Sequence, residues 1–439
     1  MNDDPRAPAR DRRAERLPPD HPERVAVANE VHARPYEALQ TPQRAEYLAL
    51  TFDRDERERE IVHLVELCRS FNVAPPMADA AHFSASLGPV RVKWERHTEF
   101  SGYTFFAPGD GEEGFGELAC SALPDGWLAA IRGKTIVAAR AKLAKFAFQT
   151  ADSDYVDAHF GGNVVVGAEI GGTGAGVAFT DFQIDGDGFV RFLVLDRHLV
   201  PRQAGRMLQR LFEIESYRVM ALLALPVARS HAPQIAAIER SLATLTAQIA
   251  RDEGGDEALL AKLTGLAAAV ESAIVASQYR FGASRAYYEL VRARIAELKE
   301  RSLPGIQTID EFMERRLAPA MATCFSVSER LRGLSDRVAQ ASGLLSTRVE
   351  IAREKQNQSL LASMDQRAKL QLRLQQTVEG LSVAAITYYV VGLVGYAAKG
   401  LKAGGVALDP EIAMAAAIPI VVIALAMLLR RVRRKLGEH

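Results

Sequence analysis

The run Leu381-Ser-Val-Ala-Ala-Ile-Thr-Tyr-Tyr-Val-Val-Gly-Leu-Val-Gly-Tyr-Ala-Ala398 decides how the chain is organised. A second uncharged run covers residues 412–429, after a short loop. At a helical rise of ~1.5 Å per residue, each run spans ~27 Å, close to the thickness of a bilayer core. The sequence therefore predicts two transmembrane helices, at about 381–398 and 412–429, that form a hairpin within residues 379–430. The alternative is two buried helices of a soluble domain, whose apolar runs are usually ~10–14 residues long.

The distribution of Lys and Arg predicts the topology, because positive charge favours the cytoplasmic side. The cations cluster at both ends of the hairpin. Arg367, Lys369 and Arg373 precede the hairpin, and Arg430, Arg431, Arg433, Arg434 and Lys435 follow its second run. In the loop 399–411, by contrast, the numbers of basic and acidic residues are balanced. Both termini are expected in the cytoplasm, with residues 431–439 as a basic tail. Residues 1–20 lack the apolar core of a secretory signal and are expected to be a disordered arm. We therefore expect a multi-pass protein of the bacterial inner membrane.

The composition excludes several function classes. Lys and Arg total 54 and Asp and Glu total 54, so the chain lacks the cationic excess on which nucleic-acid binding depends. Cys68, Cys120 and Cys324 lie far apart, without metal-site spacing. No complete catalytic, cofactor or metal motif is present. The sequence predicts no catalytic residue, cofactor or metal, and favours a protein that is not an enzyme.

Residues 21–198 alternate between strand-like and helical patterns. Runs 45–52, 90–95, 100–107, 163–170, 176–184 and 189–195 are strand-like, residues 54–71 have helical spacing, and 137–148 fit either. Glycine-rich turns separate the last three strand-like runs. We therefore expect an α+β cytoplasmic head around a largely antiparallel sheet.

The composition changes abruptly at residue 199, and residues 199–378 are rich in Ala, Leu, Arg, Glu and Gln. One helix is expected from about 207 until Pro226, a second at 235–249 and a third at 257–300. A fourth is expected to start near 326–328 and to continue into the first transmembrane run. These helices predict a coiled-coil stalk, through which the chain would form a homo-oligomer or bind a protein partner.

Two polar clusters are candidate ligand-binding sites. Glu30, His32 and Arg34 place an acid, an imidazole and a cation within Asn29-Glu-Val-His-Ala-Arg-Pro35. That set suits an anion or a metal, although one His and one carboxylate are too few for a zinc site; the alternative is a structural helix end. Glu215 and Arg218 stand three residues apart on an apolar helix, where they favour an ion pair at an inter-domain contact or, less readily, a site of chemistry.

The glycine loop 171–176 is a third candidate, with the composition of a phosphate-binding loop. A strand-like run follows it rather than a helix, and no Lys-Ser/Thr pair is present. A hairpin turn is therefore expected.

Two motifs together resemble a known family. These are Asn29–Pro35 and Gln209-Arg-Leu-Phe-Glu-Ile-Glu-Ser-Tyr-Arg-Val-Met-Ala-Leu-Leu-Ala-Leu-Pro226, which look like those of an uncharacterised bacterial family of membrane-anchored proteins. The resemblance covers roughly residues 20–430. It implies a fold and a membrane location, but no activity.

The overall plan also resembles the CorA-type magnesium channels, in which a cytoplasmic domain and a stalk helix lead into two spans. Those channels carry Gly-Met-Asn after the first span, where this chain reads Gly395-Tyr-Ala-Ala-Lys-Gly400. The leading hypothesis is a membrane-anchored binding, scaffold or oligomerisation module. The alternatives are a CorA-like divalent-cation channel and a head that acts as an enzyme or binds a ligand through Glu30, His32 and Arg34.

Overall fold

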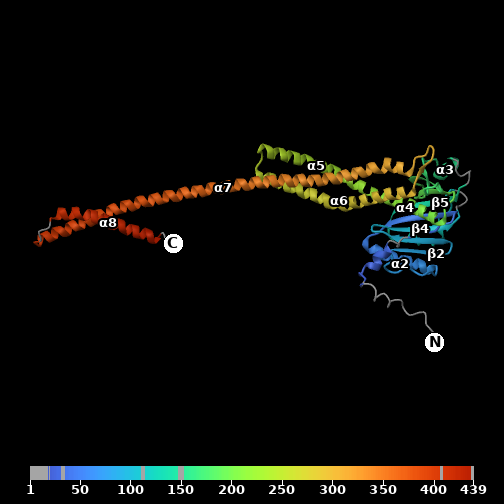
Figure 1. The fold of residues 1–439 in the computed structure, drawn as a ribbon, viewed down its shortest axis with the longest axis horizontal. Helices are drawn as coiled ribbons and strands as arrows, with labels where there is room; N and C mark the ends of the chain where they lie inside the picture. The colour runs from blue at the N-terminus through green and yellow to red at the C-terminus, as the bar shows by residue number, and fades with distance from the viewer. Residues whose placement is uncertain are drawn as a thin grey trace, which may run out of the picture. The chain divides into compact units, whose positions relative to one another are not determined.

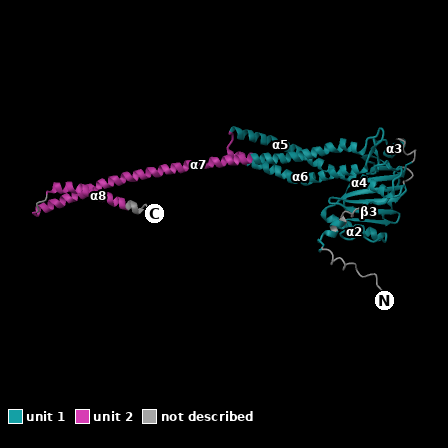
Figure 2. Cartoon of the chain, in the orientation of Figure 1, with its two compact units in different colours: residues 1–251, 261–340 teal, residues 252–260, 341–439 magenta. Residues whose placement is uncertain are grey.

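The computed structural model describes residues 18, 20–30, 35–109, 114–146, 153–405 and 409–436. The chain divides into two compact units (Figure 2). Unit 1 contains residues 1–251 and 261–340, and unit 2 contains residues 252–260 and 341–439.

A nine-stranded sheet forms the centre of unit 1, in the order β2-β3-β4-β1-β5-β8-β7-β6-β9. Its strands are β1 (Gln43–Thr51), β2 (His82–Leu87), β3 (Val90–Arg96), β4 (Ser101–Pro108), β5 (Lys134–Lys145), β6 (Val166–Ile170), β7 (Gly176–Ile184), β8 (Val190–Asp196) and β9 (Arg301–Ser302). All neighbouring strands pair antiparallel except β5 and β8, which are parallel. The expectation of a largely antiparallel sheet is thus confirmed.

Alternating side chains give the sheet two buried faces. On one face, Trp94 and Phe105 pack with Leu64 of helix α2 (Arg54–Ser70) in a single apolar cluster. On the other face, Tyr47 of β1 stacks on Phe212 of helix α4 (Pro201–Leu222) at a centroid distance of 5.1 Å. Helix α4 therefore covers one side of the sheet and α2 the other.

Several short elements complete unit 1. Helix α1 (Arg24–Glu30) precedes the first strand, and the 3₁₀ turn η1 (Ala119–Ala122) and helix α3 (Ser153–Phe160) lie between strands in the sequence. Residues 137–148, which fitted either pattern, lie largely in strand β5, and the glycine loop 171–176 joins the antiparallel strands β6 and β7. The sequence did not predict β2, α3 or β9.

Four long helices come after α4 in the chain: α5 (Ala224–Arg251), α6 (Asp256–Leu298), α7 (Ile309–Ala403) and α8 (Pro410–Leu436). Within unit 1, α5, α6 and α7 run side by side (Figure 1). Arg330 of α7 pairs with Glu239 of α5 at 2.7 Å, and the rings of Phe325 on α7 and Tyr288 on α6 meet edge to face.

Three predicted helix boundaries were wrong: the end of the first helix, the start of the second, which is Ala224 rather than residue 235, and the start of the last. The break after α4 falls at Leu223 rather than Pro226, because Pro226 lies in the first turn of α5, where its missing N–H costs no helical hydrogen bond. Helix α7 begins at Ile309, well before residue 326. A capping box starts it: the Glu311 N–H donates to the Thr308 hydroxyl at 3.1 Å, and the Thr308 N–H donates to the Glu311 carboxylate at 3.0 Å.

Three helices of the described residues are long and apolar enough to cross a membrane. The two predicted transmembrane runs lie in α7 and α8. The third candidate, α6, was predicted as a helix but not as a transmembrane one. In unit 2, α7 and α8 meet at Gly395, where an added Cβ would lie 2.4 Å from the sulfur of Met414. A larger residue at this position would require the flexible Met414 side chain to move.

Candidate binding cavity under helix α4

A small cavity lies between helix α4 and strands β1, β3 and β4. Its volume of about 30 Å³ is room for roughly two water molecules at ~10–15 Å³ each. Its lining mixes charged, hydroxyl and aromatic side chains: Glu37, Tyr47, Lys93, Glu95, His97, Phe100, Thr104, Phe106, Leu208, Gln209, Phe212, Glu213, Ser216 and Tyr217. This concentration of polar groups inside an apolar layer makes the cavity the candidate functional site.

One charged group in the cavity is the ammonium of a buried lysine. The Lys93 side chain is only 5 % exposed, and its ammonium lies 3.0 Å from the Glu95 carboxylate. It also donates to the Gln209 side-chain carbonyl at 2.9 Å. Burial of an ammonium is costly unless it is paired, and Glu95 and Gln209 supply the partners of Lys93 under α4.

The polar contacts continue from Gln209 across α4 to helix α6. The Gln209 amide donates to Glu213 at 2.7 Å, and Glu213 pairs with Arg294 of α6. Arg294 also contacts Glu297 at 2.9 Å. An unbroken chain of charge-assisted contacts thus links the cavity to α6.

Hydroxyl groups form the other side of the cavity. The Ser216 hydroxyl lies 3.0 Å from the Tyr47 hydroxyl and donates to the Phe212 carbonyl at 2.8 Å. Burial raises the pKa of Tyr47 far above its usual value, so this phenol stays protonated and serves as a hydrogen-bond donor or acceptor rather than as a base.

The chain that follows the Asn29–Pro35 motif reaches the same cavity. Glu37 lines it and pairs with Arg91 at 2.9 Å. The guanidinium of Arg206 on α4 lies over the Tyr36 ring at 5.7 Å. At Gly205 an added Cβ would lie 1.6 Å from the Glu37 carbonyl oxygen, so the glycine is what lets this segment lie directly on α4.

We expect Gly205→Ala to lower the stability of the full-length chain by ~1–3 kcal/mol, the usual cost of overpacking. The control is Gly282→Ala in helix α6, where an added Cβ meets nothing within 4 Å. That change should stabilise by ~0.5–1 kcal/mol, as expected for alanine in a helix. Thermal unfolding in detergent, followed by circular dichroism, measures both. Equal effects of the two changes would contradict the close contact at Gly205.

The predicted site residues have different outcomes. His32 and Arg34 lie outside the described residues, as does the side chain of Glu30. Glu215 and Arg218 form the expected ion pair, with two hydrogen bonds of 2.9 and 2.6 Å. A role of any of these residues in ligand binding stays a prediction.

The Glu215–Arg218 pair belongs to a different contact from the cavity. Arg218 lies over the ring of Phe182 at 5.4 Å, and Phe182 stacks on Phe312 of α7 at 5.1 Å. The pair therefore ties α4 to a bulge of β7 and to the start of α7. It is Gln209, Glu213 and Tyr217 that face the cavity.

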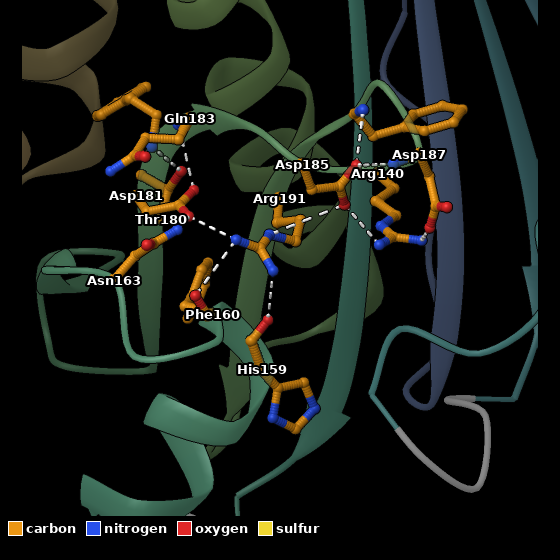
Figure 3. Close-up of polar contacts among 12 residues, drawn as sticks. Arg140, His159, Phe160, Asn163, Thr180, Asp181, Gln183, Asp185, Asp187 and Arg191 are labelled. Carbon is orange, nitrogen blue, oxygen red and sulfur yellow. Dashed lines mark hydrogen bonds and ion pairs between the residues drawn. The ribbon is translucent and has the colours of Figure 1, made fainter.

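A second charged cluster lies on β5, β7 and β8 (Figure 3). Arg191 pairs with Asp181 at 2.6 Å and donates to the backbone carbonyls of His159 and Phe160. Arg140 pairs with Asp185 at 2.5 Å. Burial lowers the pKa of His159, which keeps that imidazole neutral. Since each guanidinium faces a carboxylate, the cluster fastens helix α3 and the β7–β8 turn to the sheet.

Within the described part of the chain, no group of three or more His, Cys, Asp or Glu side chains is placed to hold a metal ion. None of the curated proteins and none of the solved structures matches the chain. A family model matches residues 19–436, and its description is "Protein of unknown function (DUF3422)". Because this match covers nearly the whole sequence, the chain belongs to the DUF3422 family of proteins of unknown function.

Proposed function

We propose that the chain is a non-enzymatic binding or scaffold module anchored in the bacterial inner membrane. The α7–α8 pair would form the transmembrane hairpin, with both termini in the cytoplasm and the loop 399–411 outside. The residues of unit 1 would then work in the cytoplasm, and the helical stalk would present a surface to another copy of the chain or to a protein partner.

One observation carries this proposal. Helix α7 is continuous from Ile309 to Ala403. Its first part is packed into unit 1, where Met321 is buried and Phe325 contacts α6. Its last part contains the uncharged run 381–398. A single helix that is both packed into unit 1 and long and apolar enough to enter a bilayer is suited to anchor that unit to a membrane.

The third apolar helix, α6, fits better as a packed helix of unit 1 than as a span. Val270, Phe281 and Val291 are buried, and the Ser284 hydroxyl donates to the Ala221 carbonyl of α4 at 2.7 Å. Arg280 pairs with Glu99 next to β4 at 2.9 Å. A helix with these partners would have to leave the head to enter a membrane.

The cavity under α4 is the binding site that we propose for the head. Each of its carboxylates has a cation beside it, since Glu37 faces Arg91, Glu95 faces Lys93 and Glu213 faces Arg294. The cavity is thus close to neutral, which suits a small polar molecule better than an ion. Glu30, His32 and Arg34 precede Glu37 in sequence and are proposed to contribute to ligand binding.

Reporter fusions test the topology. A reporter active only outside the cytoplasm should be silent when fused after His439 and active when inserted at Gly404. The reason is that the cations following residue 429 resist translocation. An active fusion after His439, or a silent insertion at Gly404, would contradict the proposed hairpin.

A further inference from the structure

We propose that a second copy of this chain docks in parallel along one face of α7, between Leu360 and Ala385; this rests on the proposed membrane anchoring. The face, here called the stalk seam, has a heptad repeat. Two sets of positions recur seven residues apart: Leu360, Arg367, Leu374 and Leu381, and Met364, Gln371, Val378 and Ala385. Alternate spacings of four and three residues put all eight on one side of a helix, the pattern of a coiled coil.

The same helix shows what such a repeat does when it has partners. In unit 1, Leu317, Cys324, Leu331 and Val338 also recur every seven residues of α7, and each is at most 2 % exposed. Helices α5 and α6 pack against that part of α7. In the stalk seam, Leu360, Leu374 and Leu381 are instead 55 to 76 % exposed. The stalk seam thus has the same seven-residue spacing as the buried part of α7, but its leucines are exposed.

Helix α8 covers the stalk seam only in part: Leu425, Leu428 and Leu429 line a pocket with Gln371, Leu374 and Val378, yet Leu374 and Val378 stay 67 and 57 % exposed. The residues of α7 that lose exposure beside α8 include Val383, Thr387, Gly395 and Ala398. Their spacing of four and three residues places them on a face about half a turn away from Leu381 and Ala385. The contact between α7 and α8 therefore leaves most of the stalk seam exposed.

A second copy is the occupant that fits the anchoring. Two chains held in one membrane by the same hairpin have parallel stalks, and their seams start at the same height, so identical residues face each other. Confinement to the membrane also raises the effective concentration of one stalk beside another. Leu361, Ala368 and Leu370 flank the seam with apolar side chains, which widens the contact. Polar Asp365, Lys369 and Arg373 occupy the far side of the helix, with Lys369 and Asp365 already paired at 2.6 Å.

Arg367 and Gln371 interrupt the apolar seam in consecutive layers. A polar residue at a core position of a coiled coil lowers its stability and fixes its register. We infer that these two residues hold the copies in register and keep the association reversible. Gln371→Leu should therefore increase the fraction of oligomer in detergent, and Gln376→Leu, on the polar side, should leave it unchanged.

Cysteine cross-linking in membranes tests the stalk seam with the full-length chain. Leu374→Cys and Leu381→Cys should each give disulfide-linked dimers when an oxidant is added, whereas Lys369→Cys and Gln376→Cys on the polar side should give at most a tenth as much. The parent chain, with Cys68, Cys120 and Cys324, is the background. In detergent, the parent should elute as an oligomer and the double change Leu374→Asp, Val378→Asp as a monomer.

The outcomes are separable. A membrane-bound chain that stays monomeric and gives no dimers from Leu374→Cys would overturn the seam and leave the anchoring intact. Equal cross-linking from both sides of the helix, or cross-links to a different protein in place of dimers, would overturn it as well. If the anchoring itself were wrong, the chain would instead fractionate away from the membrane, and the reporter at Gly404 would be silent.

Discussion

Liposomes that carry the purified chain are expected to take up Mg²⁺ no faster than protein-free vesicles. The competing proposal, a CorA-like divalent-cation channel, requires a conduction path made by the transmembrane helices. The runs 381–398 and 412–429 hold no Asp, Glu, Lys, Arg or His, and such residues usually mark an ion pathway within a membrane. The turn after the first run also lacks Gly-Met-Asn. We therefore expect the hairpin to anchor the chain without conducting.

Three further variants make this test decisive. A chain whose hairpin is replaced by an unrelated two-span anchor should keep its other properties, because the anchor is then interchangeable. Gly392→Leu changes a position with free space around it, whereas Gly395→Leu disrupts the contact with Met414. Uptake well above that of protein-free vesicles, and lost in Gly392→Leu, would establish the channel and refute the anchor.

The sequence predicted most of the elements whose patterns are local. Strands β1, β3, β4, β7 and β8 and helix α2 show clear alternation or helical spacing, so neighbouring residues suffice to recognise them. Strand β2, by contrast, reads His82-Phe-Ser-Ala-Ser-Leu87, where small residues weaken the pattern. The early start of α7 was missed although Thr308 and Glu311 carry the signal of a capping box.

The cavity was harder to predict because it depends on contacts far apart in sequence. Lys93 and Glu95 alternate with Val92 and Trp94, a pattern that normally indicates a solvent-exposed face. Helix α4 covers that face, and Gln209, the partner of Lys93, lies 116 residues further along the chain. No local pattern reports such a covering. A lysine and a glutamate on one face of a strand, in a sheet followed by a helix with buried-type spacing, would have been the only hint.

Lys93→Met should lower the stability of the chain by ~3–5 kcal/mol, because it removes the ammonium that faces the buried Glu95 carboxylate. Burying two charges is itself costly, so the double change Lys93→Met, Glu95→Met should recover most of that loss. The control is Lys369→Met, which breaks an exposed pair with Asp365 of similar distance, 2.6 Å, and should cost at most ~0.5 kcal/mol. Chemical unfolding in detergent gives the coupling energy from the four-variant cycle.

The double variant then separates structure from function in the cavity. It retains a folded head but replaces the charge pair under α4 with two apolar side chains of similar length. If the head binds a small polar molecule or a partner there, components that co-purify with the parent should be lost from the double variant and kept in Lys369→Met. A stable double variant that keeps every such component would show that Lys93 and Glu95 serve only the packing of α4. A cost below 1 kcal/mol for Lys93→Met alone would mean that the pair is not buried, and the cavity would lose its place as the candidate site.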